Sequence, residues 1–169
     1  MLDEGFVGAF LIMLTMSNNG FNLLPANIVN MHALQTLTFN SNALAELPPT
    51  ISGLTSMTEL WLSDNLISVL PETLFLLTKL VILALNGNSI PSLHASLGWL
   101  INLEQLYLQN NVIFEMPNTI VSIQKLQVLN LAGNALETCP QVRLPRPSRF
   151  QNFCEIKKHN KITRRGFCL

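Results

Sequence analysis

Residues 34–56 read LQTLTFNSNALAELPPTISGLTS, and residues 57–79 read MTELWLSDNLISVLPETLFLLTK. Apolar residues stand at matching places in both segments, and each segment has an asparagine at its ninth position and a Leu-Pro pair in its second half. The spacing returns from residues 80 and 103 and, with a broken second half, from residue 126; it also extends backwards to residue 11. Six registers of 23 residues without an insertion predict a repeat protein.

Each unit is too short to bury an apolar face alone, so neighbouring units must stack into a solenoid. Apolar and polar residues alternate in the first half, which predicts a short inward-facing strand on the concave side. In the second half, proline followed by apolar residues three apart predicts one short helix or 3₁₀ turn on the convex side. His94 replaces this proline in the fourth unit, so an irregular turn is expected there, with Leu93, Leu97 and Leu100 still packed.

The asparagines at the ninth position predict a ladder of buried side-chain amides. Each amide is expected to bond backbone groups of its own turn and of the next unit, because a buried amide needs partners. Replacing one by alanine should cost about 1–3 kcal/mol in unpaired backbone groups. The ladder residues are Asn19, Asn42, Asn65, Asn88, Asn111 and Asn134.

This pattern resembles that of leucine-rich repeat proteins of the 23-residue L-P-x-x-I type, over residues 11 to about 140. Intracellular scaffolds such as the Ras-suppressor and Scribble-like proteins and their plant and protist relatives are of this type. The resemblance implies an α/β solenoid with parallel strands on its concave face. It also implies a non-catalytic scaffold in the cytoplasm that binds a protein, with a small-GTPase or phosphatase pathway component as the partner and no cofactor.

The two ends of the chain depart from the repeat. Arg143 and Arg146 stand where core residues of the sixth unit belong, so the array should stop near Pro140. Phe6, Val7, Phe10 and Leu11 are expected to fold over the first repeat as a poor cap. The predicted divisions are an N-terminal edge at 1–10, six repeats at 11–140 that start at residues 11, 34, 57, 80, 103 and 126, and a basic tail at 141–169.

The ten basic and ten acidic residues balance, but they are segregated along the chain. Residues 1–142 carry two lysines against nine acids, whereas residues 143–169 carry eight cations against one acid. The tail could contact lipids or nucleic acid, dock on the acidic concave face, or remain a solvated, mobile end after Phe150, Phe153, Cys154 and Ile156 shield the last repeat. The cations nearest the end of the chain are Lys157, Lys158, Lys161, Arg164 and Arg165.

The repeat register identifies side chains that should face solvent on the concave strands. Trp61 and Tyr107 belong to the central column and should stand roughly 10 Å apart, with the small Ala84 between them as an apolar notch. Exposed Trp and Tyr beside a gap are typical of interface hot spots, although both rings could simply cover the sheet. The predicted binding residues are Trp61, Tyr107, Ala84, Glu59, Asp64, Ile82, Gln105 and Glu104.

Catalytic and metal-binding interpretations are weak. The three histidines are far apart in the register, so no Ser-His-Asp or Cys-His arrangement can be placed, and the glycines are too scattered for a phosphate-binding loop. Cys154, His159 and Cys168 give only three ligands at wide spacing, whereas a structural zinc site needs four. The sequence therefore predicts no enzyme and no metal site.

Three cysteines form no disulfide framework, and no Asn-x-Ser/Thr site occurs, which favours an intracellular protein. The apolar stretch 6–16 resembles a signal-peptide core, but the acidic residues before it and its fit to the repeat register argue for a first core strand. Two alternatives remain open. One is a recognition module from a larger enzyme or receptor, and the other is a secreted immune-type recognition protein.

Overall fold

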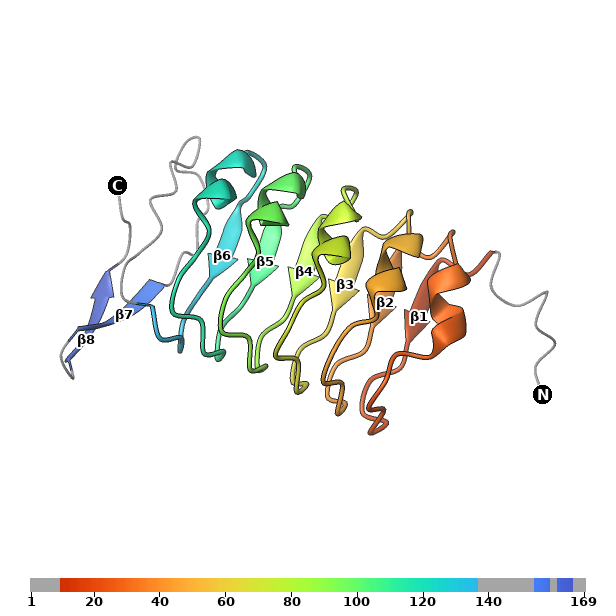
Figure 1. Ribbon diagram of the computed structural model, residues 1–169, viewed down its shortest axis with the longest axis horizontal. Helices are drawn as coiled ribbons and strands as arrows, with labels where there is room; N and C mark the ends of the chain where they lie inside the picture. Colours follow the sequence, from red (N-terminus) through yellow and green to blue (C-terminus); the bar gives the residue numbers. More distant parts are fainter. Residues whose placement is uncertain (1–9, 137–153, 159–160, 166–169) are drawn as a thin grey trace.

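The computed structural model describes residues 10–136, together with the backbone of residues 154–158 and 161–165. Six strands form one parallel sheet in sequence order, and between each strand and the next the chain makes a short helical turn in front of the sheet (Figure 1). The strands are β1 (Met13–Thr15), β2 (Thr36–Thr38), β3 (Glu59–Trp61), β4 (Ile82–Ala84), β5 (Gln105–Tyr107) and β6 (Val128–Asn130). The predicted solenoid with parallel strands is confirmed.

The strand register follows the 23-residue period without a slip. Each strand residue pairs with the residue 23 positions later, as in Leu37 with Leu60 and Leu60 with Leu83. The central leucine of the strands therefore stacks in one inward-facing column, and from β2 to β5 it is at most 1% exposed. Burial of such a side chain contributes about 1.5–3 kcal/mol, so this column stabilises the stacking of one unit on the next.

The convex side consists of five short 3₁₀ helices, one in each of the first five units. In each of them the carbonyl of the residue before the helix accepts a hydrogen bond from the backbone N–H three residues later. For example, the Leu74 N–H donates to Pro71 O at 3.0 Å. Because proline at that place needs no N–H partner, it suits the start of the turn. The helices are η1 (Ala26–Asn30), η2 (Pro49–Gly53), η3 (Glu72–Leu76), η4 (Ala95–Trp99) and η5 (Asn118–Ser122).

The irregular turn expected in the fourth unit is not found. His94 has φ −68° and ψ 151°, close to the −66° and 142° of Pro71, and η4 has the same length as the other helices. The His94 side chain accepts a hydrogen bond from the Ser96 N–H at 3.2 Å and so caps the helix. A histidine in extended conformation with this cap therefore replaces the proline, and the predicted irregularity was wrong.

The asparagine ladder is present, but it runs in the opposite direction from the prediction. The Asn65 Nδ2 donates to Leu62 O in its own turn and to Phe39 O in the preceding unit, while its Oδ1 accepts from Leu44 N in that preceding unit. Each later asparagine repeats this geometry toward the unit before it. Asn19, in the first unit, is exposed and its amide donates only to Ser17 O.

The two ends of the described chain differ from the predictions in one respect. At the N-terminal side, β1 joins the sheet, with Leu11 and Leu14 packed on the core as the repeat register predicts. At the C-terminal side, β7 (Cys154–Lys158) and β8 (Lys161–Arg165) form an antiparallel hairpin where a mobile end was expected. The Ile and Thr residues of these two segments favour strands. The hairpin was not predicted, because the 23-residue period does not extend into this part of the chain.

Several predictions fall outside the described residues. Phe6 and Val7 of the proposed cap, the end of the array near Pro140 and the shielding role of Phe150 and Phe153 belong to this group. Of the other two proposed cap residues, Leu11 packs on the core, but Phe10 is 83% exposed and does not cover it. None of the helices among the described residues is long and apolar enough to cross a membrane.

Candidate functional site

The concave face presents the columns of side chains that the repeat register predicts. The central column passes through Trp61 on β3, Ala84 on β4 and Tyr107 on β5, which are direct partners across the sheet. The neighbouring column places Glu59, Ile82 and Gln105 in the same order. All of these residues except Ala84 are partly exposed, so this face offers a mixed aromatic and polar surface.

The notch predicted between the two aromatic rings is absent. The Trp61 and Tyr107 rings are stacked, with centroids 6.3 Å apart and planes 22° from parallel, and Ala84 beneath this face is only 1% exposed. The prediction took the separation of the backbones, whereas each long side chain leans over the alanine from its own strand. The two rings thus close into one aromatic platform, in an offset-stacked arrangement that such rings favour.

Hydrogen bonds fix the position of both rings. The Trp61 Nε1–H donates to Glu59 Oε2 at 3.2 Å, and the Tyr107 hydroxyl donates to Gln105 Oε1 at 2.9 Å. Each partner stands two residues earlier on the same strand, so both rings are tethered toward the same end of their strands. Because the polar atoms are already paired, the aromatic platform is held in place before any partner arrives, which lowers the entropy cost of binding.

Acidic groups surround the aromatic platform. Glu59 lies beside Trp61, and Glu104 directly precedes β5, where its Oε2 accepts from Gln127 Nε2 at 3.0 Å. Asp64 is exposed in the turn that follows β3. Within residues 10–136 the basic side chains are Lys79 and Lys125, and each precedes a strand rather than lying in one. The described part of the concave face therefore carries carboxylates without cations among its strands.

The turns that follow the strands share a backbone conformation that was not predicted. The eighth residue of every unit has a positive φ, between 53° and 68°, in the turn that follows the strand. Such a backbone is tolerated by Gly, Asn, Asp and occasionally Ser, and the sequence carries only these types there, so the signal was present. The turn residues are Asn18, Ser41, Asp64, Gly87, Asn110 and Gly133. Among the described residues, one further glycine, Gly20, also has a positive φ.

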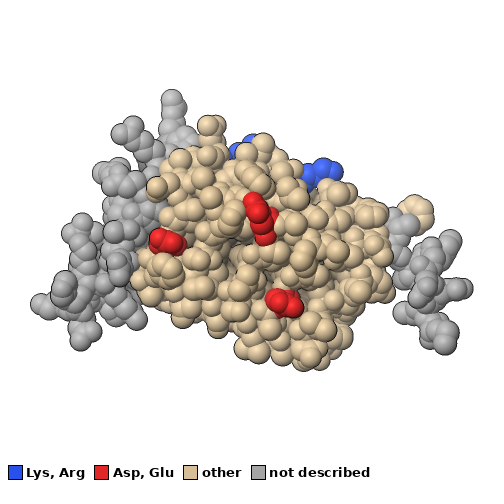
Figure 2. Space-filling model, viewed as in Figure 1, with Lys and Arg blue, Asp and Glu red and all other residues tan. Residues whose placement is uncertain are grey.

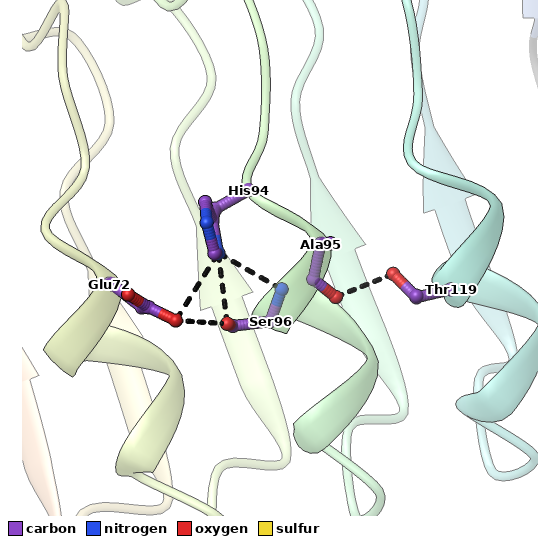
Figure 3. Close-up of polar contacts among 5 residues, drawn as sticks. All are labelled: Glu72, His94, Ala95, Ser96 and Thr119. Atoms are coloured by element: carbon purple, nitrogen blue, oxygen red, sulfur yellow. Dashed lines mark hydrogen bonds and ion pairs between the residues drawn. The ribbon is translucent and has the colours of Figure 1, made fainter.

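A cluster on the convex side brings together residue types that the sequence could not place near one another. The Ser96 hydroxyl donates to Glu72 Oε1 at 2.7 Å and lies 2.9 Å from His94 Nδ1, and that same nitrogen is 3.6 Å from the Glu72 carboxylate (Figure 3). This contact was not foreseen from the sequence, in which Glu72 and Ser96 are 24 positions apart. The figure shows it spanning η3 and η4.

The geometry of this cluster suits a helix cap better than a nucleophile. In a serine nucleophile the histidine bonds the hydroxyl with one ring nitrogen and the acid with the other. Here the serine and the carboxylate approach the same nitrogen of His94, and Ser96 is only 3% exposed. The cluster links η3 to η4, as the Thr119 hydroxyl links η5 to Ala95 O at 2.6 Å. Among the described residues, no group of three or more His, Cys, Asp or Glu side chains could hold a metal ion.

Comparison with known proteins identifies the fold. No family model and no curated protein matches this sequence. Among solved structures, the leucine-rich repeat protein LIC12759 of Leptospira interrogans is similar over 83% of this chain and 43% of its own, with 24% identity and a TM-score of 0.59.

Two plant receptors are similar as well. The peptide hormone receptor RGFR1, in complex with RGF2, matches 67% of this chain with 28% identity and a TM-score of 0.63. The leucine-rich repeat ectodomain of the Arabidopsis thaliana receptor kinase GASSHO1/SCHENGEN3, in complex with CASPARIAN STRIP INTEGRITY FACTOR 2, matches 73% with 32% identity and a TM-score of 0.68. This chain spans 19% and 16% of those chains, and less than half of the Leptospira protein. The fold is a leucine-rich repeat solenoid.

Proposed function

We propose that this leucine-rich repeat solenoid is a non-catalytic protein-interaction module that binds an extended segment of a partner on its concave face. The observation that carries the proposal is the aromatic platform of Trp61 and Tyr107, a partly exposed ring pair fixed by its own hydrogen bonds. Exposed Tyr and Trp are enriched among residues that dominate binding energy, and a preformed pair avoids an ordering cost.

The charge of the face suggests the chemistry of the partner. Glu59, Asp64 and Glu104 would attract basic side chains, while Ile82 and the two rings would contact apolar ones. An arginine or lysine over an aromatic face next to a carboxylate gains a cation–π contact and an ion pair together. A partner segment that combines apolar and basic residues therefore fits this surface best.

The similar structures support a peptide or protein as the ligand class. RGFR1 is described in complex with RGF2, and GASSHO1/SCHENGEN3 in complex with CASPARIAN STRIP INTEGRITY FACTOR 2. Both matches exceed 25% identity, but this chain spans less than a fifth of each receptor chain. Their ligands therefore suggest what kind of molecule the concave face binds, and leave its identity to experiment.

We further propose that the protein acts in the cytoplasm as a scaffold of the L-P-x-x-I type, with a component of a small-GTPase or phosphatase pathway as its partner. The Leu-Pro pairs, the odd number of cysteines and the lack of an Asn-x-Ser/Thr site support this setting. A recognition module of a larger receptor is the second candidate, and its similarity to two receptor ectodomains favours it. Fractionation of cells that express the native gene separates the two, because a scaffold of this kind stays in the cytosolic fraction.

A displayed library of random peptides tests the binding face. The full chain is the bait, and the affinity of selected peptides is then measured for wild type, the Trp61→Ala/Tyr107→Ala variant and the matched control Trp99→Ala, which removes an exposed indole from η4. We expect selected peptides to be rich in Arg or Lys with apolar neighbours, and to lose at least about a hundredfold in affinity in the double variant alone. Equal affinity for the double variant and wild type would exclude the aromatic platform as the site.

A further inference from the structure

Among residues 10–136, the eight exposed large apolar side chains that follow residue 24 lie on two edges of the solenoid, four on each, and are between 49% and 66% exposed. One edge, the post-strand flank, follows the strands and their turns; the other, the pre-strand flank, consists of the ends of the 3₁₀ helices and the links into the next strands. The post-strand flank holds Leu66, Val69, Val112 and Phe114, and the pre-strand flank holds Leu76, Trp99, Ile101 and Val121. Four others, Phe10, Ile12, Met13 and Leu23, lie in the first unit or directly before it.

The exposed charged residues of the two flanks are opposite in sign, whereas Glu104, in the link into β5, is half-buried and bonded to Gln127. Lys79 and Lys125, the only cations within residues 10–136, end their units on the pre-strand flank. Glu46 and Glu115 lie on the post-strand flank, where Glu46 forms a backbone bridge with Val69 and Glu115 follows Phe114. All four charged residues are exposed. Figure 2 shows basic side chains along the upper edge of the face in view and acidic ones over its middle and lower parts.

These flanks lie on opposite sides of the molecule. In Figure 1 the strands run from the upper edge, where the pre-strand flank lies, to the lower edge, where the post-strand flank lies. A second copy displaced along the strand direction, without rotation, would therefore bring its pre-strand flank against the post-strand flank of the first. Exposed apolar patches of this kind mark interaction surfaces more often than chance.

We propose that the two flanks bind each other between copies of this chain, so that the solenoids associate side by side. The positions of the charged residues on the two flanks match, which supports a second copy of this chain as the partner rather than an unrelated protein. Glu115 and Lys125 belong to the same unit, 103–125, and would face each other across the contact. Glu46 and Lys79 belong to adjacent units, about 4.8 Å apart along the sheet, which a lysine side chain can span.

Side-chain size matches as well. Trp99, the largest side chain of the pre-strand flank, belongs to unit 80–102, whose post-strand flank carries only Ser89, Pro91 and Ser92. The units on either side of it present larger apolar residues on that flank, so the indole of one copy fits the gap of the other. Because this contact joins two different surfaces, it does not close on itself and adds copies in a row.

Charge exchange tests the proposal on the full chain by sedimentation velocity over a range of concentrations and salt. The basic-to-acidic variant is Lys79→Glu/Lys125→Glu, and the acidic-to-basic variant is Glu46→Lys/Glu115→Lys. We expect wild type to form growing oligomers that weaken with salt, and each variant alone to associate roughly thirtyfold more weakly, since two attractions become two repulsions. A control, Thr36→Lys/Thr38→Lys/Glu59→Lys, makes the same net charge change within β2 and β3 on the concave face and should associate like wild type.

Mixing the two variants gives the sharpest outcome. The first variant has two acidic flanks and the second has two basic flanks, so like copies repel while both kinds of contact between unlike copies are attractive. The mixture should therefore form growing oligomers in which the two variants alternate, although each variant alone stays largely monomeric, and the chain with all four exchanges should associate like wild type again. A monomeric wild type at every concentration, association that all variants retain, or a mixture that stays monomeric would each overturn the proposal. Loss of association in the concave-face control alone would also overturn it.

Discussion

Removal of the Asn88 side chain tests how the ladder holds the solenoid together. Asn88 lies in the middle of the array and is 8% exposed; its Oδ1 accepts from Ile67 N at 2.9 Å. Its Nδ2 donates to the carbonyls of Leu62 at 3.0 Å and Leu85 at 2.9 Å. In Asn88→Ala these two carbonyls keep the amides of neighbouring ladder asparagines. The Ile67 N–H, in a residue that is 0% exposed, loses its acceptor.

One buried unpaired N–H and two weakened carbonyl contacts should lower the free energy of unfolding by about 2–3 kcal/mol. Urea denaturation of the full chain measures this change, and hydrogen exchange at the Ile67 amide locates it. The control is Asn19→Ala, which removes an exposed ladder residue with one donated bond and should cost less than about 0.5 kcal/mol. Equal losses of stability in the two variants would refute the stabilising contribution assigned to Asn88. Unchanged protection of the Ile67 amide would refute its hydrogen bond to the asparagine of the following unit.

Two further substitutions test local backbone geometry. In Gly87→Ala the new Cβ would lie 2.2 Å from Asp64 Oδ1, so we expect urea denaturation to show a loss of about 2 kcal/mol, against about 1 kcal/mol for Gly20→Ala, which has the same backbone strain and open space. Asp64→Gly in the Gly87→Ala background should remove that difference, and its persistence would count against the steric cause. His94→Pro should change stability by less than about 0.5 kcal/mol, because φ already suits proline and the lost cap on Ser96 is offset in the unfolded chain. A thermal shift that indicates a loss above about 2 kcal/mol would contradict this balance.

Much of the fold could be predicted because residues 23 positions apart occupy equivalent places in successive repeats. The strand columns, the buried leucines and the 3₁₀ helices follow from alternation and from the proline, and each recurs often enough to exclude chance. The direction of the ladder was missed, since the spacing of Asn42 and Asn65 is the same whichever neighbour they bond. Only the path of the backbone decides that the amide reaches back to the preceding unit.

The register predicted where the residues of the candidate site lie on the concave strands, but not the arrangement of their side chains. The register gives the backbone spacing of Trp61 and Tyr107, and the rings can stand apart or lean together on the same backbone. Hydrogen bonds to Glu59 and Gln105 favour the closed arrangement, and they depend on rotamers that no spacing encodes. The contact of Ser96 with Glu72 was missed for the related reason that stacking joins residues 24 positions apart.

Affinity capture from a lysate of the native cells tests the central claim most directly. Three baits are compared, namely wild type, Trp61→Ala/Tyr107→Ala and the control Trp99→Ala, and the captured proteins are identified by mass spectrometry. The account predicts a partner that wild type and the control retain and that the double variant loses, because the aromatic platform on the concave face is the binding site. A partner captured equally by the double variant and wild type would contradict it.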